Sequence, residues 1–583
     1  MLKILKYFQK KEWLLVACGL LFIVIQVWFD LKIPDFMHDI TTLVQTDGSE
    51  ISEVLKQGSF MVLSAIGSMI SAMLVAFFAA RLAAGFSKRL RGKVFDKTLS
   101  FNMEEISGFS TASLITRSTN DIIQIQMLLI LGLEIVLKAP ILAIWAVFKI
   151  MGKSWEWTFT TGVAVVILLV LIAIVISITL PKFRIIQRLT DNLNLVTREN
   201  LSGIRVVRAY NATGHHEQKF EKANDDLTRT NLFTSRTMAI LMPAISLIMS
   251  GMTLAIYWIG AFLINDSVQE ARLPLFSDMV VFSSYAMQVI MAFMMISVVF
   301  IMLPRALVSA RRVNEVLDTE VKITDGNGQE SNVTGKVEFR HVSFKYPGAD
   351  EYFLKDINFT ATKGETVAII GATGSGKSTL FNLIPRFMEA TEGEVLIDGI
   401  NVRNYNLATL RDKLGYVSQK PVMFKGTVAS NVQFGAQEEA LDKEVERAVS
   451  IAQGTEFVEK MEETYQSDVA QSGTNLSGGQ KQRLSIARAI YKNPEIYLFD
   501  DSFSALDYRT DRMLRSELKK QIKDATTLIV AQRIGTIIDA DRIIVLDKGE
   551  VVGIGTHAEL MNDCEVYQEI AYSQLSKEEL SNG

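Results

Sequence analysis

The sequence predicts an α-helical transmembrane domain of six spans with long cytoplasmic extensions, fused to an α/β domain that carries a P-loop. Hydrophobic residues make up 49% of the 583 residues and the mean hydropathy is +0.22, which is too apolar for an ordinary soluble protein. Charges nearly balance, with 60 basic against 64 acidic residues. This balance excludes a nucleic-acid partner held by bulk charge, and the apolar content excludes a disordered chain.

Six apolar runs are each about 20 residues long, which is enough for a helix to cross about 30 Å of hydrocarbon. They lie near 13–33, 57–80, 128–150, 157–180, 238–264 and 279–303. We expect the first run to be an uncleaved membrane helix, because the apolar stretch before the lipoprotein-like positions 15–18 is too short for a signal peptide. The even number of crossings places both termini on one side of the membrane.

Lys and Arg residues beside the spans gather on one side. They are concentrated at the start of the chain and in the connections 81–127 and 181–237, whereas the connection after the first span is acidic. Because translocation disfavours basic loops, we predict a multi-pass cell-membrane protein with both termini and the nucleotide-binding domain in the cytoplasm. The two long connections keep a helical rhythm, so they extend below the bilayer and turn near 108–113 and 211–219, where a soluble partner docks.

Few charged residues fall within the spans, and Asp30 is the only obvious one, which gives little support to a dedicated ionic substrate. Glu134 and Lys138 are one turn apart, so we expect an i,i+4 ion pair, the alternative being a pair that contacts substrate. The sixth span is rich in methionine, whose flexible side chain suits varied apolar ligands, although packing or lipid contact is the simpler role. These methionines are Met279, Met287, Met291, Met294, Met295 and Met302.

A change in composition divides the chain into a transmembrane domain over 1–320, a polar linker over 321–334 and a nucleotide-binding domain over 335–583. A strand-like run over 366–370 is followed by a glycine-rich loop and a helical pattern, which is the context of a P-loop. In such a loop, backbone N–H groups bind phosphate, Lys377 reaches the β and γ phosphates, and Ser378 offers an oxygen to Mg²⁺. The predicted phosphate-binding residues are Gly371, Ala372, Thr373, Gly374, Ser375, Gly376, Lys377, Ser378 and Thr379.

Two further segments complete the predicted site. A buried strand over 496–499 ends at Asp500, which we expect in the magnesium shell beside the P-loop. The segment 476–480 reads Leu-Ser-Gly-Gly-Gln and opens a helix. Ser477 is placed to cap that helix, whose first N–H groups are free to bind phosphate.

The segment 476–480 matches in full the signature pentapeptide of the ATP-binding cassette (ABC) family, and the whole chain resembles a half-transporter of the exporter type. The resemblance implies two chains that enclose two ATP molecules, each held by the P-loop of one chain and the pentapeptide of the other. It implies that Tyr346 stacks on adenine, that Gln419 senses magnesium and couples the site to the membrane helices, and that the turns near 108–113 and 211–219 are coupling helices. The remaining implied roles are Ser477, Gly478, Gly479 and Gln480 on the partner's ATP, Asp507 in the loop 504–507 that crosses the dimer, and Ser378, Gln419 and Asp500 on Mg²⁺.

Two positions depart from the family pattern at the γ-phosphate. Asp501 stands where the family normally has the Glu that polarises the attacking water, and its carboxylate is one methylene shorter. Gln532 stands in place of the switch histidine, and an amide cannot carry a proton or a positive charge. A misplacement of about 1 Å at a catalytic group can cost about 100-fold, so we predict a site that binds ATP but hydrolyses it slowly.

This pattern resembles the degenerate-site subunit of bacterial heterodimeric multidrug exporters. It implies a second ABC half-transporter as partner, with an intact catalytic Glu, and ATP-driven export of amphipathic compounds with ATP and Mg²⁺ as cofactors. A lipid or lipopeptide flippase shares every motif and stays open. An ATP-gated channel or regulatory subunit also stays open, because degenerate cassettes occur where ATP acts as a ligand; an importer is disfavoured because its cassettes are usually separate chains.

Overall fold

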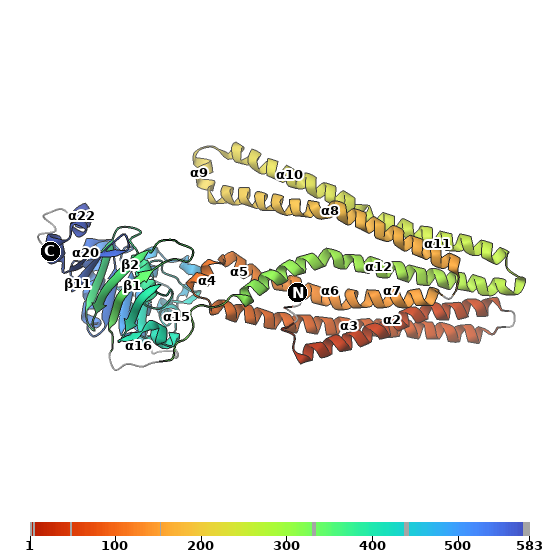
Figure 1. Ribbon diagram of the computed structural model, residues 1–583, viewed down its shortest axis with the longest axis horizontal. Coiled ribbons are helices and arrows are strands. Elements are labelled where there is room, and N and C mark those ends of the chain that lie inside the picture. Colours follow the sequence, from red (N-terminus) through yellow and green to blue (C-terminus); the bar gives the residue numbers. More distant parts are fainter. Residues whose placement is uncertain are drawn as a thin grey trace. The chain divides into compact units, whose positions relative to one another are not determined.

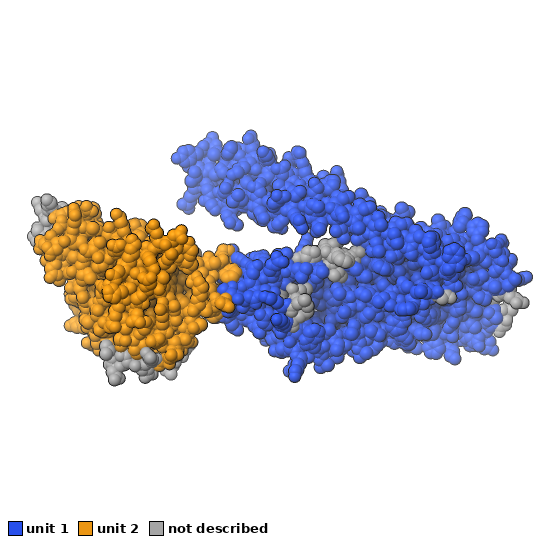
Figure 2. Space-filling view, in the orientation of Figure 1, with its two compact units in different colours: residues 1–99, 111–319 blue, residues 100–110, 320–583 orange. Residues whose placement is uncertain are grey.

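The computed structural model describes residues 3, 6–46, 49–151, 153–328, 334–435 and 442–574. The chain divides into two compact units (Figure 2). Unit 1 comprises residues 1–99 and 111–319, and unit 2 comprises residues 100–110 and 320–583. The segment 100–110 therefore groups with residues 320–583 although both of its sequence neighbours are helices of unit 1.

Unit 1 is helical throughout its ordered elements, as Figure 1 shows. Six stretches are long and apolar enough to cross a membrane, namely Lys10–Val44, Ile51–Leu99, Thr111–Ile150, Trp155–Ser202, Thr213–Asn265 and Ala271–Ile296. Each contains or overlaps one predicted run, which confirms the six-span helical domain. The helices are α2 (Lys10–Gln45), α3 (Ile51–Leu99), α4 (Met103–Ser107, part of unit 2), α5 (Thr111–Ser118), α6 (Asn120–Leu131), η1 (Gly132–Val136), α7 (Leu137–Ile150), α8 (Trp155–Ser202), α9 (Ile204–Ala209), α10 (Thr213–Ala239), α11 (Leu241–Asn265) and α12 (Gln269–Asp318).

Three helices are far longer than one membrane crossing requires. Helices α3, α8 and α12 have 49, 48 and 50 residues, so each is about 75 Å long at 1.5 Å per residue. The apolar run of each helix sets where the helix crosses the membrane. The amphipathic part that follows the run sets how far the helix extends beyond the membrane. The turn predicted near 211–219 is shorter than expected, because α10 begins at Thr213 and includes most of that range.

A glycine allows three spans of unit 1 to approach closely. The Trp157 side chain is fully buried, with its ring 5.4 Å from that of Phe282. A Cβ atom at Gly260 would collide with the sulfur of Met279 and come within 3.3 Å of the Trp157 ring. Met279 is therefore a packing residue between α8, α11 and α12.

Lys138 pairs with Asp30 of α2, which corrects the expected pair with Glu134. The Lys138 ammonium lies 3.3 Å from the Asp30 carboxylate, which also accepts a hydrogen bond from Ser68 of α3. The helix passes through the π-helical turn η1 at this point, so Glu134 and Lys138 lose the regular i,i+4 geometry. A carboxylate inside a span is costly without a partner, which favours the pair between helices.

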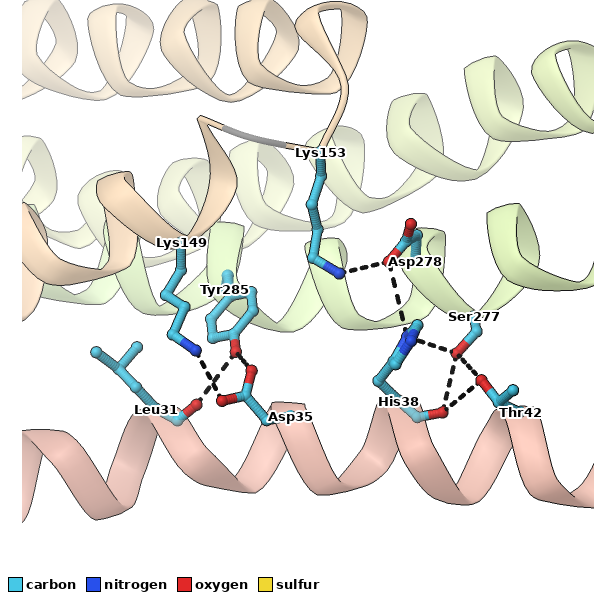
Figure 3. Close-up of polar contacts among 9 residues, drawn as sticks. All are labelled: Leu31, Asp35, His38, Thr42, Lys149, Lys153, Ser277, Asp278 and Tyr285. Atoms are coloured by element: carbon cyan, nitrogen blue, oxygen red, sulfur yellow. Dashed lines mark hydrogen bonds and ion pairs between the residues drawn. The ribbon is translucent and has the colours of Figure 1, made fainter. Parts of the chain in front are cut away.

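A second set of polar contacts joins α2, α7 and α12 near their ends (Figure 3). Asp35 accepts hydrogen bonds from Lys149 at 2.7 Å and from the Tyr285 hydroxyl. His38 Nδ1 lies 3.7 Å from Asp278 on α12. These hydrogen bonds and ion pairs connect three spans. The other residues that take part in these contacts are Leu31, Thr42, Lys153 and Ser277.

Unit 2 is built on a six-stranded sheet in the order β12-β11-β3-β10-β9-β6, in which only β12 is antiparallel to its neighbour. A four-stranded antiparallel sheet has the order β2-β1-β4-β5, and β7 pairs with β8. The strands are β1 (Val337–Phe344), β2 (Leu354–Ala361), β3 (Thr366–Gly371), β4 (Glu392–Ile397), β5 (Ile400–Asn401), β6 (Leu414–Val417), β7 (Gly426–Thr427), β8 (Asp468–Val469), β9 (Ile496–Asp500), β10 (Thr526–Val530), β11 (Arg542–Asp547) and β12 (Glu550–Gly555).

The central strand β3 is buried on both faces. Ala368 and Ile370 belong to one hydrophobic cluster, whereas Val367 and Ile369 belong to the other, as the alternation of side chains along a strand requires. The α-helices of this unit, besides α4, are α13 (Lys377–Leu383), α14 (Leu407–Asp412), α15 (Val428–Val432), α16 (Asp442–Ile451), α17 (Thr455–Glu459), α18 (Gly478–Lys492), α19 (Tyr508–Gln521), α20 (Ile534–Ile537), α21 (His557–Asp563) and α22 (Glu565–Gln574). The sequence prediction of an α/β domain fused to the spans is confirmed.

The first part of the expected linker is hydrogen-bonded to other residues of unit 2. Gly326 N–H donates to the Tyr405 carbonyl at 2.9 Å, and the Arg386 guanidinium donates to the Thr324 carbonyl at 2.8 Å. Lys322 N–H donates to Glu105 of α4 at 3.1 Å. Residues 329–333 of the expected linker lie outside the described residues.

Candidate nucleotide-binding site

The candidate site lies beyond the carboxyl ends of neighbouring parallel strands. In the sheet register, Asp500 at the end of β9 pairs with Val530 at the end of β10. Gln419, Asp501 and Gln532 follow the last residues of β6, β9 and β10 by one or two positions. Parallel strands end at one edge of a sheet, so these three side chains meet, and ligands of open α/β sheets bind at that edge.

The loop 371–376 continues directly from β3 into α13. Gly374 and Gly376 have φ values of +85° and +105°, which residues with a Cβ atom rarely adopt. A Cβ atom at Gly371 would collide with the Leu546 carbonyl oxygen. Glycine at these positions therefore lets the loop, including Ala372 and Thr373, fold tightly at the start of α13.

Lys377 is the cation at the centre of this loop. Its ammonium donates to the carbonyls of Gly371 and Ala372, both at 2.8 Å, and lies 3.4 Å from Ser375 Oγ. Burial lowers the pKa of Lys377, and the carboxylates of Asp501 and Asp500 oppose that shift. A phosphate placed in the loop would add negative charge beside this ammonium and favour its charged form.

Ser378 and Asp500, the two residues predicted to bind magnesium beside the P-loop, are in direct contact. Ser378 Oγ donates to Asp500 Oδ1 at 2.9 Å, and Asp500 is only 4% exposed. Burial raises the pKa of Asp500, the hydrogen bond from Ser378 lowers it, and the adjacent charge of Asp501 raises it. The buried Asp500 carboxylate and the Ser378 hydroxyl are hard oxygen donors of the kind that suits a divalent cation such as Mg²⁺.

One oxygen of the Asp501 carboxylate accepts hydrogen bonds from two glutamine side chains, Gln419 and Gln532. Gln419 Nε2 donates to Asp501 Oδ2 at 3.0 Å, and Gln532 Nε2 donates to the same oxygen at 2.9 Å. Asp501 itself has a φ of +49° and is 8% exposed. Two amide donors thus share Asp501 Oδ2 and fix the direction of this short side chain.

Tyr346 connects the antiparallel sheet to the P-loop helix. Its hydroxyl shares a hydrogen bond of 2.8 Å with Thr379 Oγ1. Its ring lies 4.9 Å from the ring of Phe344 and 5.2 Å from that of Phe353, both at steep angles. The half-buried ring is therefore held in place by two T-shaped aromatic contacts and by its hydroxyl.

The pentapeptide and Asp507 lie at the starts of two helices. Ser477 and Gln480 cap α18 reciprocally, since Ser477 N–H donates to Gln480 Oε1 at 2.8 Å and Gln480 N–H donates to Ser477 Oγ at 3.3 Å. A Cβ atom at Gly479 would lie 3.4 Å from the Ala505 carbonyl oxygen, whereas one at Gly478 would meet open space. Asp507 accepts from Thr510 N–H at 3.0 Å, and this bond lowers its pKa.

Within the described part of the chain, the hydrogen bonds of Ser477, Gln480 and Asp507 stay inside their own helices. The residues that meet around the P-loop are instead Gln419, Asp500, Asp501 and Gln532, with Tyr346 at Thr379. Sequence reasoning missed Gln574, whose side chain bonds the main chain on both sides of Arg533. A single glutamine 42 residues from Gln532 carries no motif that would have indicated this contact.

The chain matches two family models, described as the ABC transporter transmembrane region over residues 14–293 and the ABC transporter over residues 354–504. An uncharacterized ABC transporter ATP-binding protein of Mycobacterium tuberculosis is 37% identical over 518 residues, covering 88% of this chain and 87% of that protein. The ATP-dependent lipid A-core flippase of Pseudomonas aeruginosa is 30% identical over 501 residues, covering 86% and 82%. A bacterial Atm1-family ABC exporter, solved with ATP bound, has the same fold, with a TM-score of 0.79 and 24% identity over 95% of this chain and 97% of that chain.

Proposed function

The chain belongs to the ABC transporter family as a half-transporter of the exporter type, with one membrane domain fused to one nucleotide-binding domain, and on this premise we propose that it is the weakly hydrolysing half of a heterodimer. Its partner is a second half-transporter with an intact catalytic Glu. Together the two chains export amphipathic compounds across the cell membrane. The basic inner connections support an orientation with both termini and the nucleotide-binding domain in the cytoplasm.

The observation that carries this proposal is the double hydrogen bond on Asp501. A general base must reach its water at about 2.6–3.2 Å with a free acceptor atom. The Asp501 oxygen that faces Gln419 and Gln532 already accepts from both amides. The two amides hold the carboxylate on a short side chain, which restricts how far either of its oxygens can reach towards a water and so favours binding of ATP over its hydrolysis at this site.

The residues around the P-loop fit ATP and Mg²⁺. When bound, Mg²⁺ would neutralise part of the phosphate charge of ATP. Ser378, Asp500 and Gln419 offer oxygen ligands to the metal. Lys377 and the N–H groups of the loop hold the phosphates, and Tyr346 stacks on the base. The pentapeptide residues 477–480 and Asp507 complete the ATP site on the partner.

The proposed substrate class depends on apolar and flexible side chains of α12. Met287 and Met291 are about two-fifths exposed on this helix, and exposed methionines suit ligands of varied shape. The side chain of Met302 lies outside the described residues. Lipid export is the second candidate, because one relative is named as a lipid A-core flippase.

The test is to purify the chain alone and together with candidate partner half-transporters, and to measure Mg-ATPase activity and oligomeric state in nanodiscs. We expect little activity from the chain alone and drug-stimulated activity with one partner. In that complex, Asp501→Ala is expected to change the rate by less than about twofold, whereas replacing the partner's catalytic Glu by Gln abolishes most of it. Equal losses at the two sites, or full activity of a homodimer, would contradict the asymmetric assignment; stimulation by lipid but not by drug would favour the flippase.

A further inference from the structure

Helix α22, the last helix that the structure describes, packs against α20 and β11. Tyr567 and Ala571 are fully buried in the hydrophobic cluster that also contains Ile534 and Ile537 of α20. Residues 567, 571 and 574 follow the i, i+4, i+7 spacing of one helix face. Gln574 therefore lies on the face of α22 that is turned towards α20.

The Gln574 amide makes two hydrogen bonds to the main chain around Arg533. Its Nε2 donates to the Gln532 carbonyl at 2.7 Å, and its Oε1 accepts from Ile534 N–H at 2.9 Å. Ile534 is the first residue of α20, and the first N–H groups of a helix have no partner within the helix. Gln574 supplies that partner from a helix that is distant in sequence.

The same short segment is bonded on its other side to residues 501 and 504 of the loop that follows β9. Gln532 Nε2 donates to Asp501 at 2.9 Å, and the Arg533 guanidinium donates to the Ser504 carbonyl at 3.2 Å. The side chain of Gln532 thus points to Asp501 while its carbonyl is held by Gln574. Loss of the bond at the carbonyl would free the backbone that fixes the direction of the side chain.

We propose that Gln574 is a positioning residue that fixes Gln532 towards the γ-phosphate and so makes the site select ATP over ADP. This inference rests on the proposed function, in which ATP binds at the P-loop of this chain. ADP lacks the γ-phosphate, so its binding does not depend on Gln532. A merely structural role of α22 would instead change the binding of both nucleotides equally.

The chain offers a matched control on the same helix. Gln568 Nε2 donates to the carbonyls of Met561 at 2.8 Å and Asn562 at 3.3 Å, so it joins α22 to α21 by equivalent bonds that do not reach residues 532–534. Gln574→Ala and Gln568→Ala remove the same chemical group from one helix. Gln574→Glu keeps an acceptor for Ile534 N–H but loses the donor to the Gln532 carbonyl.

The first measurement needs no nucleotide. Hydrogen exchange of the full-length complex is followed for the peptide that contains Ile534. Gln574→Ala is expected to speed exchange of the Ile534 amide about 3- to 10-fold, since one hydrogen bond is lost. Gln568→Ala and Gln574→Glu are expected to leave this amide protected, and equal protection in Gln574→Ala would overturn the proposed contact.

The second measurement is nucleotide affinity on this chain, using photolabelling with 8-azido-ATP and 8-azido-ADP and separation of the two subunits by electrophoresis. Gln574→Ala is expected to weaken ATP binding about 3- to 10-fold with less than twofold change for ADP. In a Gln532→Ala background, Gln574→Ala is expected to have no further effect, because the two residues act through one contact. Equal weakening of ATP and ADP, or additive losses, would assign Gln574 a structural role and overturn the inference.

The proposed ATP site and the positioning role of Gln574 can be refuted independently of each other. If the wild-type chain is not labelled by 8-azido-ATP, or if Lys377→Ala leaves its labelling unchanged, the proposed ATP site is wrong and the inference is overturned with it. If the wild-type chain is labelled and Gln574→Ala preserves its ATP affinity, only the positioning role is wrong.

Discussion

Replacing Asp501 by Glu is expected to raise hydrolysis at this chain's own site. Gln419 and Gln532 hold Asp501 Oδ2 at 3.0 and 2.9 Å, so the carboxylate is fixed close to its own backbone. One additional methylene extends its reach by about 1.5 Å, the length of a C–C bond. Because about 1 Å of displacement can be worth about 100-fold in rate, we expect an increase of about 10- to 100-fold.

The assay is Mg-ATPase activity of the proposed heterodimer, with the catalytic Glu of the proposed partner replaced by Gln so that the remaining phosphate release comes from this site. Asp501→Asn keeps the length of Asp without its charge and serves as the control, for which no gain is expected. Labelling with 8-azido-ATP checks that nucleotide binding is retained. A variant Asp501→Glu that binds ATP as the wild type does and hydrolyses it no faster would refute the argument from carboxylate reach.

Three further tests address separate parts of the structure. Lys138→Met leaves Asp30 unpaired inside a span and is expected to cost about 3 kcal/mol of stability, measured as a lower melting temperature in detergent; adding Asp30→Asn should restore most of it. Tyr346→Ala is expected to weaken ATP binding up to about 10-fold while Tyr346→Trp preserves it, measured by fluorescent nucleotide titration. Mg²⁺-dependent ATP binding is expected to weaken as pH falls through the raised pKa of Asp500, because the protonated carboxyl no longer offers a negative charge to the metal. The stability of the chain without nucleotide is expected to change in the opposite direction. The folded state holds this proton more tightly than the unfolded state, so Asp500 favours folding at the lower pH. Asp500→Asn should remove this pH dependence together with the dependence on Mg²⁺, and a wild-type profile in that variant would exclude the carboxyl as its source.

The membrane fold could be predicted because each crossing is encoded locally. An apolar run of about 20 residues has few alternatives to a spanning helix. The partner of Lys138 could not be predicted, because Asp30 lies on another helix and the π-helical turn η1 removes Glu134 from the regular spacing. Pairing between helices depends on how they pack, which the sequence periodicity of one helix does not contain.

At the nucleotide site, too, the sequence predicts the local features but not the contacts between distant residues. The P-loop and the strand before Asp500 are contiguous segments whose chemistry follows from residue type and order. The contact of Gln419 and Gln532 with one oxygen of Asp501 depends on the order of three parallel strands. Gln574 reaches Gln532 only because Tyr567 and Ala571 anchor α22 in the core, and no local pattern in the sequence reports such an anchor.

The two departures from the family pattern form one structural unit rather than two independent changes. Gln532 donates to Asp501, and Asp501 has no second methylene with which to reach past that amide. If only Gln532 or only Asp501 is replaced, the unchanged residue keeps the position it has in the present contact. Residues that share a hydrogen bond are expected to be non-additive, so Gln532→His should add more to hydrolysis in the Asp501→Glu background than in the wild type. Equal gains in the two backgrounds would mean that each residue acts on the γ-phosphate independently, and the shared oxygen would then have no role in slowing this site.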